Sequence, residues 1–193
     1  MNKDFTTFLA TNAGISTQQL TLLEKNIVQK NVSKGSFLLN KGAICKQSFY
    51  VEKGLLRFYS IDQFGKEHII QFAPEGWFIS DRSSIYFNEP TEYYIDAIED
   101  STVVSLDEQF TCSVSEISPA FAKHNEQLLQ KHIRHLQKRI NLLIGATAED
   151  RYVDFIKSYP DLTQRVPQWM IASYLGITPE SLSRVRKELV KKQ

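Results

Sequence analysis

The chain has 193 residues, of which 42% are hydrophobic and 23% charged, and its formal net charge is +1. This length suffices for one large and one small domain, while the overall charge neither favours nor excludes a nucleic-acid partner. No apolar run approaches the roughly eighteen residues of a membrane span, and none follows the N-terminus as in a secretion signal. We therefore expect a cytoplasmic protein without a membrane partner.

The two cysteines, Cys45 and Cys112, stand far apart and form no CxxC pattern. This spacing excludes a disulfide framework and a four-cysteine metal or iron–sulfur site within one chain. We expect both thiols to be structural or incidental in a reducing compartment, and we expect no cofactor.

Short strands separated by turns are predicted after a small helix at residues 16–25, in which Ser16 and Gln19 have the spacing of a capping box. From about Ile27 to Asp107, glycine turns recur at roughly ten-residue intervals between β-rich stretches. Strands this short must close on one another to bury a shared face, which predicts an antiparallel β-roll of the jelly-roll type in an α+β protein. The clearest strands are residues 48–52, 54–59, 68–72 and 102–106.

A long helix is predicted from about Pro119 to Ile144. Apolar residues in it step by four, three, four and three positions, as the a and d positions of a coiled coil do. The helix would be on the order of 40 Å long, more than a small domain needs for its own core. We expect it to pair with a second copy in a homodimer, and packing against its own β-roll is the alternative. The apolar residues are Leu129, Ile133, Leu136, Ile140 and Leu143.

Gly145-Ala146-Thr147 has the composition of a hinge between the long helix and the C-terminal part. Thr147 can cap the next helix, with Asp150 at the third position after it. We expect an effector to rotate the C-terminal part about this segment. The expected domains are residues 1–115, with the β-roll, residues 116–146, with the dimerisation helix and hinge, and residues 147–193.

Residues 168–187 have the order of a helix-turn-helix. Ala172 is small where two helices must cross closely, and Gly176 tolerates the left-handed backbone that ends the first helix. Thr178 followed by Pro179 is typical of an N-cap with proline in the first helical position. The second helix, from about residue 179 to 191, therefore begins at a defined place and is the candidate recognition helix.

The two faces of this second helix differ in chemistry. Leu182, Val185 and Leu189 form an inward stripe, and charged residues recur on the outer face, which can enter a major groove. Arg184 suits guanine O6 and N7, and Glu180 suits the cytosine amino group. An isolated charged face is usually only solvated, but the surrounding motif favours double-stranded DNA. The residues expected at the DNA are Gln168, Thr178, Glu180, Ser181, Ser183, Arg184, Lys187 and Lys191.

Charge is distributed unevenly along the chain. Residues 151–193 carry eight basic and four acidic residues, a net +4, and residues 123–150 carry five and three, a net +2. Residues 1–122 carry ten and fifteen, a net −5. A basic C-terminal end on an acidic body suits a protein that presents one end to a polyanion.

The order of small helix, β-roll, long helix and helix-turn-helix resembles the Crp/Fnr family of bacterial transcription regulators over nearly the whole chain. Its most specific parts are the helix-turn-helix, the glycine-spaced strands such as residues 49–54, and the turn at residues 75–79. The resemblance implies a dimer on a palindromic operator, with Glu180 and Arg184 at the base-reading positions and Ser183 beside them. It leaves RNA polymerase open as a further partner.

The resemblance is weakest at the effector site. Cyclic-nucleotide binders of this family hold the cyclic phosphate with an Arg-Ser or Arg-Thr pair, and this chain has Thr91-Glu92 at that position. Without the guanidinium, we expect no tight binding of cyclic AMP or cyclic GMP. An unidentified small-molecule effector and a purely structural β-roll both stay open. The expected pocket residues are Ser80, Asp81, Arg82, Thr91 and Glu92, and the aromatic residues that favour an apolar ligand are Trp77, Tyr86, Phe87, Tyr93 and Tyr94.

Two smaller expectations concern DNA affinity and histidine. Family members often continue into a β-hairpin wing, whereas this sequence ends at Gln193, so we expect Arg165, Gln168 and the terminal lysines to support the recognition helix. His132 and His135 share a helical face, but the sequence offers no third ligand, so we expect no metal site. At a dimer seam this histidine pair would make assembly pH-sensitive.

Two other classes of protein compete with a DNA-binding regulator. A β-roll can also form a cupin-type enzyme, but the sequence has no metal-ligand cluster on the strands and no nucleophile–base signature. A ligand-binding module that acts only through protein partners is the other alternative. We therefore expect a non-enzymatic, sequence-specific regulator of transcription.

Overall fold

The computed structural model describes residues 4–12, 14–23 and 27–191, and within these residues eight strands form two antiparallel sheets. The strands are β1 (Val28–Val32), β2 (Phe37–Leu39), β3 (Ser48–Lys53), β4 (Leu56–Ile61), β5 (Glu67–Ala73), β6 (Phe78–Ile79), β7 (Tyr94–Ala97) and β8 (Ser101–Leu106). Their orders are β1-β8-β3-β6 in one sheet and β2-β7-β4-β5 in the other. The predicted antiparallel β-roll is confirmed.

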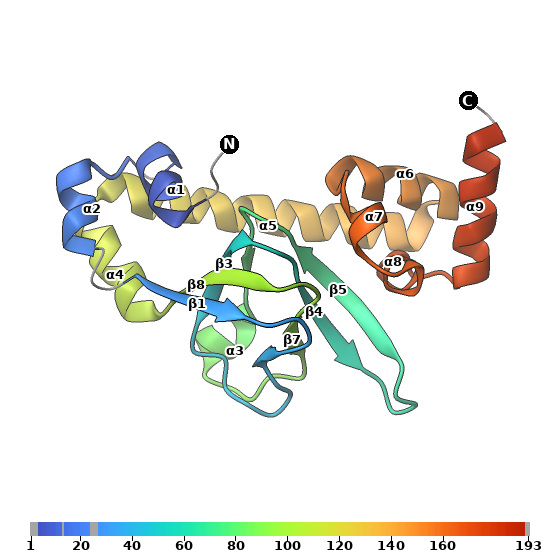
Figure 1. Ribbon diagram of the computed structural model, residues 1–193, viewed down its shortest axis with the longest axis horizontal. Coiled ribbons are helices and arrows are strands. Elements are labelled where there is room, and N and C mark those ends of the chain that lie inside the picture. The colour runs from blue at the N-terminus through green and yellow to red at the C-terminus, as the bar shows by residue number, and fades with distance from the viewer. Residues whose placement is uncertain (1–3, 13, 24–26, 192–193) are drawn as a thin grey trace.

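Helices precede, interrupt and follow the β-roll. They are α1 (Phe5–Asn12), α2 (Thr17–Leu23), α3 (Arg82–Phe87), α4 (Glu108–Ile117), α5 (Pro119–Gly145), α6 (Ala148–Ser158), α7 (Leu162–Arg165), α8 (Gln168–Leu175) and α9 (Pro179–Lys191). Helix α5 runs along the molecule, with α1 and α2 at one end, the β-roll beside its middle and α6 to α9 at the other end (Figure 1). The predicted long helix is therefore confirmed in place and length.

The helix boundaries agree with the sequence in part. Ser16 and Gln19 form the predicted capping box, because the Ser16 amide donates to the Gln19 side chain at 2.9 Å and the Gln19 amide donates to the Ser16 hydroxyl at 3.4 Å. The predicted end of that helix at Lys25 lies outside the described residues. The expected domain boundary after residue 115 falls inside α4, a helix that the sequence analysis did not predict.

The interior of the β-roll is an apolar cluster between the two sheets. Val51 and Val103 from one sheet and Leu56, Ile95 and Ala97 from the other are at most 2% exposed. Alternate residues of a strand point to opposite faces, so the neighbours of Leu56 along β4 point out of the roll. This outward face is the one that the C-terminal helices cover.

A second cluster joins the N-terminal helices to the other sheet. Phe5 and Leu9 of α1 pack with Tyr50 and Val104 of β3 and β8 and with Phe110 of α4. The Phe5 and Tyr50 ring centroids are 5.2 Å apart. Helices α1 and α4 thus cover one side of the roll and leave the sheet that contains β4 and β5 for the C-terminal part.

The third cluster is shared by the β-roll and the C-terminal helices. Leu55 and Tyr59, on the outward face around β4, belong to the same buried cluster as Phe155 of α6, Ile171 of α8 and Leu182 of α9. All five side chains are at most 2% exposed. The helix-turn-helix is therefore packed on its own β-roll through one continuous core.

Candidate nucleic-acid interface

The turn between α8 and α9 has the geometry that the sequence predicts. Gly176 ends α8 with φ 66° and ψ 35°, in the left-handed region. Its amide donates to the Ser173 carbonyl at 3.1 Å, and the Ile177 amide donates to the Ala172 carbonyl at 3.0 Å. These two bonds form a Schellman motif, which satisfies the last carbonyls of α8 and sets the angle to α9.

The beginning of α9 is also capped as predicted. The Thr178 hydroxyl accepts from the Ser181 amide at 3.2 Å, and Pro179 is the first residue of the helix. Leu182 and Val185 face inward and are 0% and 7% exposed, and Ala172 is buried at 1% where α8 passes close by. The helix-turn-helix geometry predicted for this segment is confirmed.

The outward face of α9 is open to solvent. Glu180, Ser183, Arg184, Lys187 and Lys191 are all exposed. The pKa of the Glu180 carboxyl is lowered by its own backbone amide and then by the Thr178 hydroxyl. Glu180 is therefore an anionic acceptor in the first turn, as the cytosine role would require. The other candidates at this surface are Gln168 and Ser181, which are partly buried, and Thr178, which is exposed.

Arg165 has a different place from the one expected. Its guanidinium lies between the carboxylates of Glu75 and Glu99 of the β-roll, at distances of 2.7–3.0 Å. Its side chain is only 22% exposed. The expectation that Arg165 contacts DNA is therefore wrong for this arrangement, because two acidic residues far away in the sequence bind it.

Several hydrogen bonds hold the segment between α5 and α6 in place. Thr147 and Asp150 form the predicted capping box, with the Thr147 hydroxyl accepting from the Asp150 amide at 3.1 Å and donating to its carboxylate at 2.6 Å. Arg151 donates to the Ala146 carbonyl at 3.0 Å and to the Leu175 carbonyl at 3.1 Å. Arg151 thus ties the ends of α5 and α8 together, and rotation about the hinge stays a prediction.

Helix α5 leaves part of its predicted seam uncovered. Ile133, Ile140 and Leu143 are 39%, 56% and 37% exposed, while Leu129 and Leu136 are partly buried. The other side of α5 packs on its own chain. This arrangement combines both alternatives from the sequence, since one face contacts the β-roll and the seam remains open to a partner.

The expected effector residues mostly bind one another. Asp81 caps α3, and its carboxylate accepts from the buried Thr91 hydroxyl at 2.6 Å. Glu92 pairs with Lys41 at 2.7 Å on the surface, and Arg82 is exposed. Ser80 is partly buried. The position expected to hold a cyclic phosphate thus carries a hydroxyl bonded to a buried carboxylate.

The aromatic residues expected to line an apolar pocket do not gather at one site. Trp77 packs on Tyr159, with ring centroids 5.2 Å apart, and Tyr93 packs on Phe58 at 4.6 Å. Tyr94 stacks on Tyr59 at 5.3 Å. The remaining two, Tyr86 and Phe87, are 84% and 63% exposed. Core packing accounts for Trp77, Tyr93 and Tyr94, and Tyr86 and Phe87 face solvent, so the apolar ligand stays a prediction.

The histidine pair faces its own β-roll. Burial lowers the pKa of His132, and the nearby Arg82 lowers it further. Burial likewise lowers the pKa of His135, whose ring lies edge-on to Trp77 at 6.4 Å. The lowered pKa values favour neutral rings near pH 7, and a role of the pair at the dimer seam stays a prediction.

The described residues also bear on metal binding, membrane spans and the two thiols. No three or more His, Cys, Asp or Glu side chains there are arranged to hold a metal ion. No helix there is long and apolar enough to cross a bilayer. Burial raises the pKa of the Cys45 thiol, while Cys112 is exposed.

Sequence reasoning missed the polar contacts between the β-roll and the C-terminal helices. Ser173 of α8 and Arg139 of α5 both bind the backbone of β5. A missed contact within the β-roll itself is that of buried Arg57 with Asp96, which it binds through two nitrogens at 2.7 and 2.8 Å. No local pattern marks these residues, because their partners lie 39 to 104 positions away.

Comparison with known proteins gives matches along most of the chain. Residues 29–111 match the family model of the cyclic nucleotide-binding domain. The anaerobic regulatory protein of Pasteurella multocida is 24% identical over 189 residues, which cover 92% of this chain and 68% of that protein. The fumarate and nitrate reduction regulatory protein of Vibrio cholerae is 24% identical over 183 residues, covering 89% and 72%.

Solved structures share the same architecture. FixK2 from Bradyrhizobium japonicum has a TM-score of 0.73 at 19% identity, over 86% of this chain and 85% of that chain. A CooA variant from Carboxydothermus hydrogenoformans has a TM-score of 0.72 at 22% identity, over 92% and 82%. The β-roll, long helix and C-terminal helices therefore form a fold that other proteins also adopt.

Proposed function

Because the chain belongs to the Crp/Fnr family, we propose that it is a dimeric, sequence-specific DNA-binding regulator of transcription. The observation that carries the proposal is the division of α9 into a buried apolar face and an exposed cationic face. A helix held this way by a glycine turn and a preceding helix can present its outer face to a major groove. Relatives that are named as regulators favour this class over a cupin-type enzyme.

The roles of the outward residues follow from their chemistry. Arg184 can donate two parallel hydrogen bonds to guanine, and Glu180 can accept one from cytosine. Lys187 and Lys191 lie further along α9 and suit phosphates, which position the helix without reading sequence. The remaining candidates for backbone or base contacts are Gln168, Thr178, Ser181 and Ser183.

The proposed partners are double-stranded DNA and a second copy of this chain. The open seam residues Ile133 and Ile140 on α5 would pair with the same residues of the copy. A two-fold axis along this pair places two α9 helices on one DNA face, so the operator should be a palindrome. RNA polymerase is the proposed further partner, and the cytoplasm is the proposed location.

Control by cyclic AMP or cyclic GMP is not part of the proposal. A cyclic phosphate would meet the Thr91 hydroxyl, which already donates to the buried Asp81 carboxylate, at the position where the family's cyclic-nucleotide binders have an arginine that binds phosphate bidentately. Bringing a second anion beside a buried carboxylate is unfavourable. An effector of another class stays open.

Selection of binding sites from random duplex DNA tests the proposal. The purified chain is used first without nucleotide and then with cyclic AMP. We expect an enriched palindrome in both samples. Enrichment only with cyclic AMP would contradict the assignment of Thr91, and enrichment in neither would favour the alternative of a module that acts through protein partners.

Two variants test the recognition face. Arg184→Ala should cost roughly 1–3 kcal/mol in binding and relax the preference at one base pair. Lys187→Ala, a cation one turn away, should weaken binding to all sequences alike and lower the salt dependence by about one unit of slope. Equal, small effects of both substitutions would contradict the recognition assignment.

A further inference from the structure

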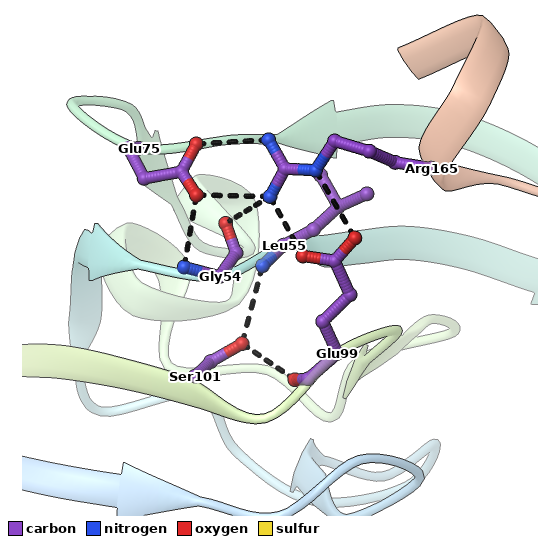
Figure 2. Close-up of polar contacts among 6 residues, drawn as sticks. All are labelled: Gly54, Leu55, Glu75, Glu99, Ser101 and Arg165. Atoms are coloured by element: carbon purple, nitrogen blue, oxygen red, sulfur yellow. Dashed lines mark hydrogen bonds and ion pairs between the residues drawn. The ribbon is translucent and has the colours of Figure 1, made fainter. Parts of the chain in front are cut away.

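The Arg165 cluster joins the helix-turn-helix end of the molecule to three turns of the β-roll (Figure 2). Arg165, at the end of α7, donates to both oxygens of Glu75 at 2.9 Å and to both oxygens of Glu99 at 2.7 and 3.0 Å. It also donates to the Gly54 carbonyl at 3.1 Å. A planar guanidinium that binds two carboxylates in this way is held in orientation as well as position. The residues of the cluster are Arg165, Glu75, Glu99, Gly54, Leu55 and Ser101.

The acceptor side of the cluster is held by the β-roll itself. Glu75 accepts from the Gly54 amide at 3.0 Å, and Ser101 accepts from the Leu55 amide at 3.2 Å and donates to the Glu99 carbonyl at 2.7 Å. Gly54 has φ 93°, and a Cβ there would lie 2.3 Å from the Ser101 hydroxyl. A side chain does not fit at Gly54 because the turns approach closely there. This close approach holds both carboxylates in place for Arg165.

The electrostatics agree with this geometry. Glu99 and then Glu75 raise the pKa of Arg165, although burial opposes them. Burial alone would raise the pKa of Glu75, but the Arg165 hydrogen bonds, the backbone hydrogen bonds of Glu75 and Gly54 and the charge of Arg165 together lower it. Both partners are therefore ionised near neutral pH, and the cluster carries one cation against two anions.

Two more polar contacts hold α8 on the same sheet. The Ser173 hydroxyl accepts from the Ile69 amide at 3.0 Å and donates to the Glu67 carbonyl at 2.8 Å, so it pairs with the free edge of β5. Pairing between β4 and β5 shifts register near Ile70. Arg139 of α5 donates to the Ile69 carbonyl at 3.0 Å and to the Ile70 carbonyl.

Arg139 also connects α5 to α8. It donates to the Tyr174 carbonyl at 3.0 Å, and its guanidinium lies 4.0 Å from the centre of the Tyr174 ring. The dimerisation helix α5, the β-roll and the helix-turn-helix are thus connected through one residue, Arg139. With the shared apolar core beneath, Arg165 is a further fixed point between the helix-turn-helix end of the molecule and the β-roll.

In the dimer, the placement of α9 on its own β-roll determines where the two recognition helices lie. Helix α9 crosses near the C-terminal end of α5 (Figure 1). A small rotation of the helix-turn-helix about that end would move α9 relative to the two-fold axis. DNA half-sites are read one helical turn apart, so the distance between the two α9 helices must match the spacing of the half-sites.

We propose that Arg165 is a positioning residue for DNA recognition: by fixing the helix-turn-helix on Glu75 and Glu99, it sets the half-site spacing that the dimer accepts. This inference rests on the proposed function. Lysine cannot replace it, because a single ammonium cannot bind two carboxylates in a planar, bidentate arrangement.

The test compares operators that differ only in the spacer between half-sites. The palindrome selected by the wild-type chain is shortened and lengthened by single base pairs, and affinities are measured for wild type, Arg165→Gln and Arg165→Lys. We expect the wild-type preference for its own spacing to fall by roughly tenfold in both variants, about 1.4 kcal/mol. Binding to a duplex with a single half-site should stay the same, because α9 is unchanged.

Controls separate positioning from loss of structure. Glu75→Gln with Glu99→Gln keeps the shape of the acceptors, so it should broaden the spacing preference as Arg165→Gln does. Lys46→Gln removes an exposed cation of the β-roll and should leave the preference unchanged. A variant that weakens single-site and paired-site binding equally, with the spacing preference intact, would overturn the inference.

The wild-type result distinguishes the two proposals. If the wild-type chain selects a palindrome and the variants keep its spacing preference, only the role of Arg165 is overturned. If the wild-type chain selects no paired sites, the proposed function and this inference both fall.

Discussion

Phe72 tests whether the β-roll and the helix-turn-helix share one core. It lies in β5 and is 0% exposed. Its ring centroid is 6.3 Å from Phe155, 6.2 Å from Tyr159 and 5.6 Å from Tyr174, all of which belong to the C-terminal part. Replacing Phe72 by Ala therefore removes a side chain of the β-roll whose aromatic partners belong to the other part.

The magnitude follows from these contacts. A buried Phe→Ala substitution costs roughly 3–5 kcal/mol, from lost burial and from the cavity left behind. Aromatic pairs add about 0.5–1.5 kcal/mol beyond the buried area. Because Phe72 has three such partners, we expect a loss of free energy of unfolding at the upper end, about 4–5 kcal/mol.

Urea unfolding at a fixed protein concentration measures the total loss, and hydrogen exchange with mass spectrometry locates it. Backbone amides in β5 and in α8 should lose protection together, because a shared core opens as one unit. Phe87→Ala is the matched control, since the same chemical change is made at a residue that is 63% exposed. It should change the free energy of unfolding by about 0.5 kcal/mol or less.

The reasoning is refuted if Phe72→Ala lowers protection in β5 while α8 keeps the wild-type value. That result would mean that the two parts open independently and that the observed contacts contribute little to stability.

Two further predictions concern the histidine pair and the turn. The pKa values of His132 and His135 are lowered from 6.5, so the unfolded chain binds protons first as the pH falls. The stabilisation that comes from keeping both histidines neutral should therefore be complete above about pH 6.5 and decrease as the pH falls below it. Between pH 7.5 and 5.5, the urea midpoint should fall less steeply in a His132→Gln/His135→Gln variant than in the wild type. Gly176→Ala should cost roughly 1–2 kcal/mol, because φ is 66° and the added Cβ lies 3.2 Å from Leu143, whereas Gly145→Ala meets no atom within 4 Å. Equal thermal shifts for the two alanine variants would contradict the turn argument.

Much of the fold could be predicted because its signals are local. Turn glycines at short intervals predicted the β-roll, and the Gly176 turn with the Thr178 cap predicted the helix-turn-helix. Both outcomes depend on backbone geometry within a few residues. Two missed helices had signals of the same kind, since Asp107 caps α4 by accepting from Phe110 at 2.8 Å and Asp81 caps α3.

The candidate DNA-binding site could likewise be predicted only in part from the sequence. Helical periodicity alone predicted which side of α9 is buried, and Leu182 and Arg184 lie on the expected faces. Periodicity could not show where Arg165 lies, because an arginine before a helix-turn-helix is equally suited to a phosphate and to a carboxylate. It could not show that the histidine rings turn toward the β-roll.

The sequence by itself determined the elements, their order and the chemistry of the recognition face, because caps, turns and hydrophobic periods act over a few neighbouring residues. Only the tertiary structure decided how the helix-turn-helix sits on the β-roll. Arg165 binds Glu75 and Glu99, which lie 90 and 66 positions away in the sequence, and Ser173 binds a residue of β5 that lies 104 positions away. Such contacts depend on how the whole chain closes, and a charged or hydroxyl side chain has the same local pattern whichever partner it meets.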